Sequence, residues 1–234
     1  MAIEILKDKR CLVTGATRGL GLALSRALAG VGALLFLSAR NNQSLADIAE
    51  SLNAKYMAVD LAQAPEVEQL ADHARRELGG IDVLINCAGV FPVNVISDSS
   101  LDEYEQCFAV NVRAPFQLCR SLATEMVQRK WGRLINIGSS SAYSGFKHTS
   151  VYCASKHAIL GLSRALHDEL KEHNVRTFCI SPGSIKTDMG RQVRGQNFET
   201  FLEPDEVADF IIKLISHDGP MIAEEVRLNR MIIQ

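Results

Sequence analysis

Tyr152 and Lys156 lie four residues apart at the start of a segment, 151–172, whose apolar spacing predicts a helix. That spacing places both side chains on one helical face. A phenol has a pKa near ~10, which is too high for an efficient base at neutral pH. An ammonium about 4 Å away contributes about 4 kcal/mol at an effective dielectric of about 20, enough to lower that pKa by roughly three units. Tyr152 is therefore a candidate general acid and base, although an interfacial tyrosine and a solvated lysine often share this spacing by chance.

Polar residues elsewhere in the chain offer partners for this pair. The run 134–137 predicts a strand and delivers Ser139 at its carboxyl end, where ligands of open parallel sheets bind. A serine hydroxyl there could polarise a substrate carbonyl through a hydrogen bond. Asn111 lies within a largely apolar stretch of a predicted helix, so its amide needs buried partners.

A glycine-rich turn follows the first predicted strand and opens a helix. Gly15, Gly19 and Gly21 have G-x-x-x-G-x-G spacing. A turn without Cβ atoms lets the backbone approach a pyrophosphate, and a helix N-terminus offers unpaired N–H groups and the positive end of its dipole. Many tight turns use glycine for other reasons, but the first strand-to-helix junction favours a dinucleotide site.

The end of the second predicted strand indicates which cofactor would bind. An acidic residue there would accept hydrogen bonds from a ribose 2′-OH and would repel a 2′-phosphate. This chain has Ala39 followed by Arg40, and Arg18 projects from the glycine turn. Guanidinium groups offer bidentate, charge-assisted bonds to phosphate. We therefore predict NADP(H) in preference to NAD(H); the alternative is that both arginines are solvated surface residues.

Short apolar runs alternate with helical patterns along the chain. The runs are nearly continuous in apolar residues, as in strands buried on both faces, and the segments between them repeat apolar residues at i, i+3 and i+4. This alternation predicts an α/β fold, a Rossmann-like doubly wound parallel sheet with helices on both faces, in a single domain over 1–234. The predicted strands cover 11–13, 33–38, 56–59, 83–86, 134–137 and 177–181, and the predicted helices cover 20–29, 43–52, 65–78, 101–129 and 151–172.

Two local features add detail. Pro65 fits the first helical position of its segment, with Ala64 in place of the usual polar cap, and Gly79-Gly80 ends that helix. The stretch 187–202 is polar and weakly periodic. It is either a mobile loop near a substrate or an ordinary surface connection.

The composition excludes several function classes. A net charge of −2 gives no general attraction for nucleic acid or an anionic membrane. The six cysteines form no CxxC or CxxH pair, so we expect buried, reduced thiols and no metal site. The segment 1–10 carries several charged residues and lacks the apolar region of a signal peptide. No run approaches the ~18 apolar residues of a membrane span. We therefore expect a soluble, cytoplasmic protein.

Together these pieces resemble the short-chain dehydrogenase/reductase family. They come in that family's order and at its spacings, over about the first four-fifths of the chain. The matching pieces are the turn 14–21, Asp60, the Asn-Cys-Ala-Gly turn 86–89, Asn111, Ser139, Tyr152, Lys156, Pro182-Gly183 and Thr187.

The resemblance implies a role for each matching residue. Tyr152 would be the general acid/base, and Lys156 would lower its pKa and hold the nicotinamide ribose. Ser139 would orient and polarise the carbonyl, with the next two serines as second choices. Asn111 would support a water-linked proton relay through Lys156. Cofactor contacts are expected at Gly15, Thr17, Arg18, Gly19, Leu20, Gly21, Arg40, Asp60, Leu61, Asn86, Ala88, Gly89, Tyr152, Lys156, Pro182, Gly183, Ile185 and Thr187.

Two features depart from the family. Cys87 replaces the second asparagine of its Asn-Asn-Ala-Gly motif, and this small neutral side chain should preserve the turn. The sequence after Gly219-Pro220 lacks the Asp-Gly-Gly signature, so we expect the family's terminal strand, which often packs across a subunit interface, to be missing. We still expect a homo-oligomer, either a dimer or a tetramer.

The resemblance implies an NADP(H)-dependent oxidoreductase that interconverts a small carbonyl compound and its alcohol. The chain looks similar to the 3-oxoacyl carrier-protein reductases. One alternative is an epimerase or dehydratase, although the short C-terminal region leaves little room for a nucleotide-sugar domain. Another is a non-catalytic NADP-binding regulator, although such proteins tend to lose the tyrosine or the lysine.

Three groups bear on the substrate, and each has two readings. Phe91, Pro92, Val93, Phe146 and Met189 either line an apolar pocket or cover the sheet. The basic group Arg129, Lys130 and Arg133 either meets an acidic carrier protein or is a solvated helix end. His148 is expected in a pocket wall or at the surface.

Overall fold

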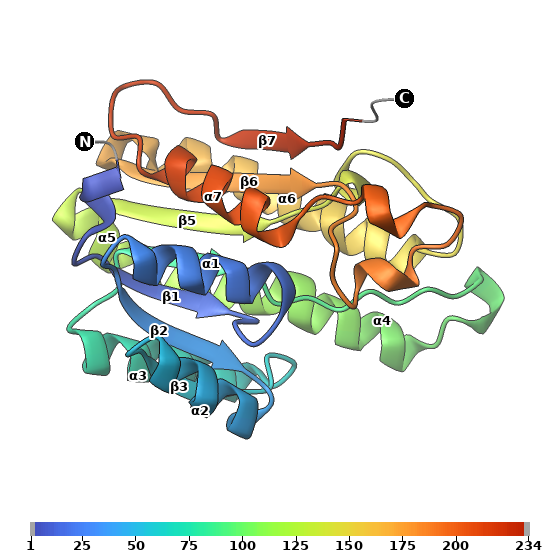
Figure 1. The fold of residues 1–234 in the computed structure, drawn as a ribbon, viewed down its shortest axis with the longest axis horizontal. Coiled ribbons are helices and arrows are strands. Elements are labelled where there is room, and N and C mark those ends of the chain that lie inside the picture. The colour runs from blue at the N-terminus through green and yellow to red at the C-terminus, as the bar shows by residue number, and fades with distance from the viewer. Residues whose placement is uncertain (1–2, 232–234) are drawn as a thin grey trace.

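The strands form one parallel sheet. The structure is a computed structural model that describes residues 3–231. Within these residues, seven strands lie in the order β3-β2-β1-β4-β5-β6-β7 (Figure 1), and each neighbouring pair is parallel. The strands are β1 (Arg10–Thr14), β2 (Leu34–Ala39), β3 (Lys55–Ala58), β4 (Val83–Asn86), β5 (Gly132–Ile137), β6 (Val175–Pro182) and β7 (Glu225–Leu228).

Helices cover both faces of the sheet, as the alternating pattern predicted. One core cluster joins the sheet to α1, α2 and α7, and a second joins it to α3, α5 and the end of α6. In β1, Leu12 belongs to the second cluster while Cys11 and Val13 belong to the first, which is why the strands have no polar face. The helices are α1 (Gly19–Gly30), α2 (Asn42–Ser51), α3 (Ala64–Leu78), α4 (Leu101–Phe108), α5 (Ala114–Arg129), α6 (Ser150–Leu170) and α7 (Pro204–Ile215).

The strand order reverses between β1 and β4. The chain runs from β1 outward to β3, then returns to β4 and proceeds toward β7. Ligands of doubly wound sheets bind at the carboxyl ends of the strands near such a reversal. Four turns that the sequence singled out follow β1, β4, β5 and β6, so the fold brings all of them to this one edge.

Two predictions about local structure need correction, and one helix was missed. The helix predicted over 101–129 is interrupted by a π-helix at Ala109–Arg113, between α4 and α5. Helix α3 begins at Ala64 with Gln63 as its cap residue, so Pro65 is not the first helical residue. Helix α7, with five buried apolar residues, was not among the predicted helices. Gly79 does end α3, in the left-handed conformation that glycine favours.

A terminal strand is present, contrary to expectation. β7 pairs in parallel with β6 from Cys179 to Pro182. It is an edge strand, and its ends carry polar contacts: Glu225 pairs with Arg164, and the Arg227 guanidinium stacks 4.5 Å from the Tyr143 ring centre. An edge strand of four residues need not be apolar throughout. The missing Asp-Gly-Gly signature therefore does not remove the strand.

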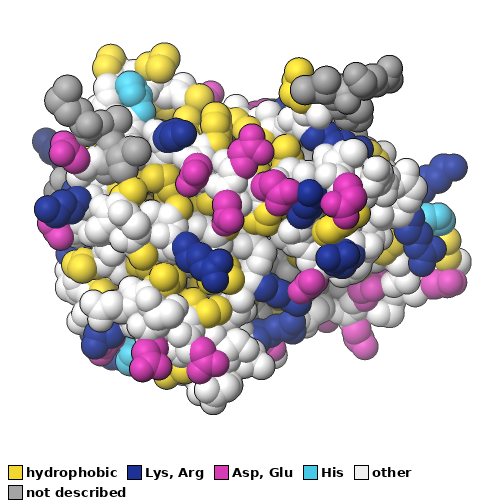
Figure 2. All heavy atoms as spheres, in the orientation of Figure 1, with side chains coloured by type: hydrophobic (Ala, Val, Ile, Leu, Met, Phe, Trp, Pro, Cys, Tyr) yellow, Lys and Arg dark blue, Asp and Glu magenta, His cyan; other side chains and the backbone are white. Residues whose placement is uncertain are grey.

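The mixed surface charge and the free cysteines agree with what the composition predicted. Acidic and basic side chains are interspersed on the face that carries α1 and α7 (Figure 2). The six cysteines are free thiols, five of them buried and Cys87 half-buried, which confirms that part of the sequence interpretation. Within residues 3–231, no helix combines the length and apolar character that a membrane crossing requires.

A part-buried ion pair at the amino ends of β1 and β4 provides a stability test. Asp82 precedes β4, is 10% exposed, and accepts hydrogen bonds from the Arg10 backbone N–H, Nε (2.8 Å) and Nη2 (2.6 Å). Burial acts to raise the Asp82 pKa, but the hydrogen bonds and charge of Arg10 outweigh it, so the pKa lies below its usual value.

Replacing Asp82→Asn should lower the free energy of unfolding at pH 7 by about 2 kcal/mol, because the Arg10 charge loses its partner. A carboxyl with a depressed folded-state pKa stabilises above its unfolded pKa, near ~3.9, and loses that contribution as the pH falls through the folded value. Urea unfolding at pH 7 and at pH 3 should show the difference between the proteins shrinking in acid. An equal difference at both values would show that the ion pair does not cause it.

Candidate functional site

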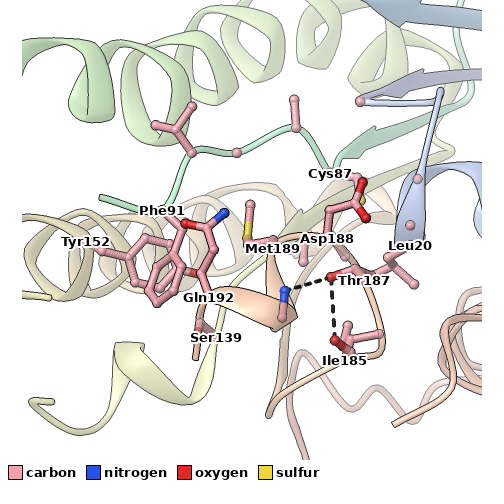
Figure 3. Close-up of a pocket in the computed structure, with 18 of the residues that line it drawn as sticks. Leu20, Cys87, Phe91, Ser139, Tyr152, Ile185, Thr187, Asp188, Met189 and Gln192 are labelled. Atoms are coloured by element: carbon pink, nitrogen blue, oxygen red, sulfur yellow. Dashed lines mark hydrogen bonds between the residues drawn. The ribbon is translucent and has the colours of Figure 1, made fainter. Parts of the chain in front are cut away.

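A cavity of about 830 Å³ opens at the carboxyl ends of the central strands. Figure 3 shows Tyr152 and Phe91 together, Ser139 below them, and Leu20 of the glycine turn at the far side. The cavity is thus continuous from the turn after β1 to the start of α6. It is lined by the predicted site residues Gly15, Thr17, Arg18, Gly19, Leu20, Gly21, Arg40, Asp60, Leu61, Ala88, Gly89, Ser139, Tyr152, Lys156, Pro182, Gly183, Ile185 and Thr187.

The glycine turn has no room for side chains at two positions. Gly15 has φ +70°, and a Cβ there would lie 2.8 Å from the Ala88 Cα. A Cβ on Gly21 would lie 2.1 Å from the Gly15 carbonyl oxygen. The first turn of α1 has no acidic residue and no side-chain cap, so its N–H groups and positive dipole end are available to an anion. This cradle fits a pyrophosphate.

Thr14 joins the glycine turn to the turn after β4. Its Oγ1 accepts hydrogen bonds from the backbone N–H groups of Cys87 (3.1 Å) and Ala88 (3.2 Å). The Asn-Cys-Ala-Gly turn is therefore held through backbone groups. This explains how the turn persists with Cys87 in the second position.

Basic residues lie at the end of the cavity near β2. Arg18 and Arg40 are exposed and both line it. The Arg18 Nη1 lies 3.6 Å from the Asp188 carboxylate, and both side chains are 71% exposed, so water screens this pair strongly. The Arg40 guanidinium makes no ion pair with the residues that the structure describes.

Asn41 and Ser44 also line this end of the cavity, and the sequence analysis did not predict them. Asn41 caps α2: its Oδ1 accepts hydrogen bonds from the Ser44 backbone N–H and hydroxyl, each at 2.9 Å. An asparagine followed three residues later by serine, just before a helix, was the available signal. The start of α2 thus lies beside Arg40, where a phosphate would meet both.

Tyr152 and Lys156 lie in one wall of the cavity and are almost fully buried, at 7% and 6% exposure. The Phe91 ring packs edge-on against Tyr152, with ring centres 4.6 Å apart. Burial raises the pKa of Tyr152 to about 12, and the neighbouring Ser139 hydroxyl acts in the opposite direction. Burial lowers the pKa of Lys156.

The expected effect of Lys156 on the tyrosine is corrected by this geometry. The Lys156 Nζ lies 5.6 Å from the Tyr152 ring centre and donates a hydrogen bond to the Ile137 carbonyl at 2.7 Å. The ammonium is thus directed to the end of β5, and the tyrosine pKa is raised rather than lowered by three units. Desolvation of the phenol outweighs the attraction that sequence spacing suggested.

The serines after β5 are arranged by a short 3-10 helix. Ser139 has extended backbone geometry, and its Oγ accepts a hydrogen bond from the Ser141 N–H at 3.1 Å. Ser139, Ser140 and Ser141 all line the cavity. Ser139 is the serine that influences the Tyr152 hydroxyl, which favours it over the second choices.

Asn111 does not line the cavity. It lies in the π-helix, is 2% exposed, and donates from Nδ2 to the Val90 carbonyl (3.0 Å) and the Ser155 hydroxyl (3.1 Å). Its Oδ1 accepts from the Val90 N–H at 2.9 Å. Pro115 has no N–H and therefore removes the usual i+4 donor for the Asn111 carbonyl. The side chain anchors the segment after β4 rather than facing the cavity.

Asn86 is also directed into the protein. Its Nδ2 donates to the Asn136 Oδ1 at 2.8 Å, and the Asn136 Nδ2 donates to the Ser163 hydroxyl at 3.0 Å. This buried chain of hydrogen bonds links β4, β5 and α6. The structure therefore gives the Asn86 side chain a place in the sheet and not in the cavity wall.

The segment 187–202 borders the cavity. Thr187 Oγ1 accepts a hydrogen bond from the Gly190 N–H at 3.0 Å (Figure 3), and an isolated bridge between Ile185 and Leu202 joins the two ends of the segment. Asp188, Met189 and Gln192 line the cavity from this segment. Of the two readings left open, the structure favours the one that places the segment beside the ligand site.

The remaining sequence candidates separate into two groups. The candidates that line the cavity are Phe91, Val93, Phe146, Met189 and His148. Pro92 does not line it.

Within the basic group 129–133, Arg133 is buried, whereas Arg129 and Lys130 are exposed at the end of α5. Arg133 is fully buried, pairs with Asp218, and stacks 4.3 Å from the Trp131 ring centre. Arg129 donates to the Ile81 carbonyl. The buried Arg133 is thus not available to a carrier protein, and Arg129 and Lys130 remain as an exposed helix end. Among residues 3–231, no group of three or more His, Cys, Asp or Glu side chains is placed to hold a metal ion.

Comparison with known proteins decides the family. Residues 9–197 match the family of short chain dehydrogenases. The chain belongs to this family. The match includes the glycine turn, the serines after β5 and the Tyr152–Lys156 pair.

Three relatives of this short-chain dehydrogenase cover nearly its whole length. A 2,3-dihydro-2,3-dihydroxybenzoate dehydrogenase of Bacillus subtilis is 31% identical over 237 residues and covers 90% of each chain. A metagenomic short-chain oxidoreductase, solved in complex with NADP, is 30% identical with a TM-score of 0.85, covering 97% of this chain and 99% of the other. A 3-oxoacyl carrier-protein reductase of Agrobacterium tumefaciens, solved with NADP bound, is 25% identical with a TM-score of 0.87, covering 96% and 94%.

Proposed function

We propose that this short-chain dehydrogenase is an NADP(H)-dependent oxidoreductase that interconverts a carbonyl compound and its alcohol. The observation that carries the proposal is the joint lining of one cavity by Tyr152, Ser139 and Lys156 at one end and by an uncapped helix N-terminus with Arg18 and Arg40 at the other. NADP is bound in two of the structural relatives, which agrees with this arrangement.

The residues present fit the cofactor. Gly15 and the first turn of α1 would hold the pyrophosphate, because both line the cavity and the helix N-terminus has no side-chain cap. Arg18 and Arg40 would bind the 2′-phosphate by charge-assisted hydrogen bonds, and Asp60 would contact the adenine. When bound, NADPH supplies the hydride. Its delivery to the carbonyl carbon requires a proton for the carbonyl oxygen.

The chain's own groups would handle that proton. The Tyr152 phenol would donate it to the carbonyl oxygen during reduction and accept it during oxidation. The Ser139 hydroxyl would donate a hydrogen bond to the same oxygen and hold it in place. Lys156 would hold the nicotinamide ribose. Asn111 would act as a positioning residue, because its amide fixes the Val90 backbone on the cavity wall.

The proposal predicts a pH dependence with a definite sign. Because burial raises the Tyr152 pKa to about 12, the phenol stays protonated at neutral pH. Reduction should therefore be flat between about pH 6 and 9, whereas alcohol oxidation should rise roughly tenfold per pH unit as the phenolate becomes more populated.

A panel of ketones and aldehydes with NADPH, followed by absorbance of the nicotinamide, tests the function and this profile together. Absence of NADPH oxidation with every class of carbonyl would overturn the function. A reduction rate that falls with a midpoint between pH 7 and 8 would leave the function intact and contradict the raised pKa.

A further inference from the structure

The cavity continues past Tyr152 into an end with apolar walls. Phe91 and Val93 line it from the loop after β4, and Phe146 lines it from the loop before α6. The Asn94 N–H donates to the His148 carbonyl at 2.8 Å, so these two loops are joined by their backbones. Met189 adds a third wall from the segment after β6, and Figure 3 shows Phe91 and Gln192 beside Tyr152.

Two basic side chains lie on the segments that carry Phe146 and Met189, and neither has an ion-pair partner among residues 3–231. Lys147 and Arg194 are exposed, line the cavity, and take part in no ion pair with the described residues. Arg194 is held near the cavity because its segment is tied back at Gln196, whose Oε1 accepts a hydrogen bond from the Ser184 hydroxyl at 3.1 Å. His148 lies beside Lys147 in the same wall.

Carboxylates do not neutralise these cations. Among the described residues that line the cavity, Asp60 and Asp188 are the acidic ones. Asp60 follows β3, at the other end of the sheet from α6 and β6. Asp188 faces Arg18, at 3.6 Å. The segments that carry Phe146 and Met189 therefore have an unbalanced positive charge, which attracts anions to the cavity.

We propose that the substrate is a carbonyl compound that carries an anionic group, a carboxylate or a phosphate, separated from the carbonyl by an apolar segment. The carbonyl would lie at Tyr152, the apolar segment between Phe91, Phe146 and Met189, and the anion at Lys147 and Arg194. This inference rests on the proposed function and adds the substrate class to it.

Matched substrates test the proposal. We expect 6-oxoheptanoate to have a kcat/KM about tenfold above that of its methyl ester, equivalent to about 1.4 kcal/mol. The preference should weaken in 0.5 M salt because exposed charges are screened. A double variant, Lys147→Gln with Arg194→Gln, should bring the ratio of acid to ester to about one. A control with Arg26→Gln and Lys213→Gln, two exposed cations outside the cavity, should keep it.

The test also separates the two sources of charge. A third substrate, 6-oxoheptyl phosphate, is compared with 6-oxoheptanoate. The substrate with the higher kcat/KM shows whether the site prefers a phosphate or a carboxylate. A higher kcat/KM for either anion than for the ester supports the proposal. An ester equal to or better than both anions would overturn it. So would an anion preference that the double variant leaves unchanged.

A binding measurement keeps this inference distinct from the proposed reaction. Hexanoate, titrated calorimetrically into the protein saturated with NADP⁺, should bind, and the double variant should weaken that binding about tenfold. If no carbonyl is reduced while hexanoate still binds through these cations, the reaction fails and the anion site stands. If neutral carbonyls are reduced and hexanoate does not bind, the anion site alone is refuted.

Discussion

Replacing Tyr152→Phe should reduce kcat for carbonyl reduction by about 1,000-fold, within the range that a positioned general acid contributes. The change removes one hydroxyl and keeps the ring, so the edge-on contact with Phe91 should persist. NADPH should then bind as in the parent protein, because the phosphate-binding cradle lies at the other end of the cavity. Single-turnover kinetics and a fluorescence titration with NADPH separate the two effects.

A matched control comes from Tyr104→Phe. Tyr104 is 43% exposed on α4 and does not line the cavity, so this variant should retain full turnover. Turnover of the Tyr152→Phe protein within tenfold of the parent would remove the phenol from the mechanism. Loss of NADPH binding in the same variant would assign Tyr152 to the cofactor site and not to proton transfer.

Charge reversal at Arg40 should have the second large effect. Arg40→Glu removes a charge-assisted bond to the 2′-phosphate and adds repulsion, and each bond of this kind is worth about 1.5–3 kcal/mol. A glutamate here would also accept hydrogen bonds from a ribose 2′-OH. The ratio of kcat/KM for NADPH to that for NADH should therefore fall about 100-fold, measured with one carbonyl substrate.

The control for this prediction is Arg26→Glu. Arg26 is exposed on α1 and does not line the cavity, so the same change in net charge should leave the ratio within about twofold. A preference for NADH in the parent protein would contradict the NADP(H) assignment. An unchanged ratio in the Arg40→Glu protein would transfer the phosphate contact to Arg18 or to the start of α2.

The predictable part of the fold is the part that burial determines. Strands β1, β4 and β5 are buried on both faces, so they appear in the sequence as short apolar runs. β7 was missed because an edge strand with Glu225 and Arg227 has no such run. The π-helix was missed because apolar periodicity continues across it, although Pro115 inside a predicted helix was a usable warning.

The sequence predicted which residues lie near the cavity better than it predicted the direction of their side chains. Strand ends and turns identified most of the cavity lining, because parallel strands bring their carboxyl ends to one edge. Side-chain direction could not be read in the same way. Asn86 and Asn111 turn inward to Asn136 and Val90, and the Lys156 ammonium is directed to the Ile137 carbonyl. Each depends on a hydrogen-bond partner that lies far away in the sequence.

The irregular turn at Ala109–Arg113 constrains how this chain can change in length. A π-turn accommodates one residue more than an α-turn, and each residue rotates an α-helix by ~100°. Deleting one residue here would restore a regular helix, but it would turn either Asn111 away from Val90 or α5 away from the sheet. Insertions and deletions should therefore be selected against in the middle of this helix.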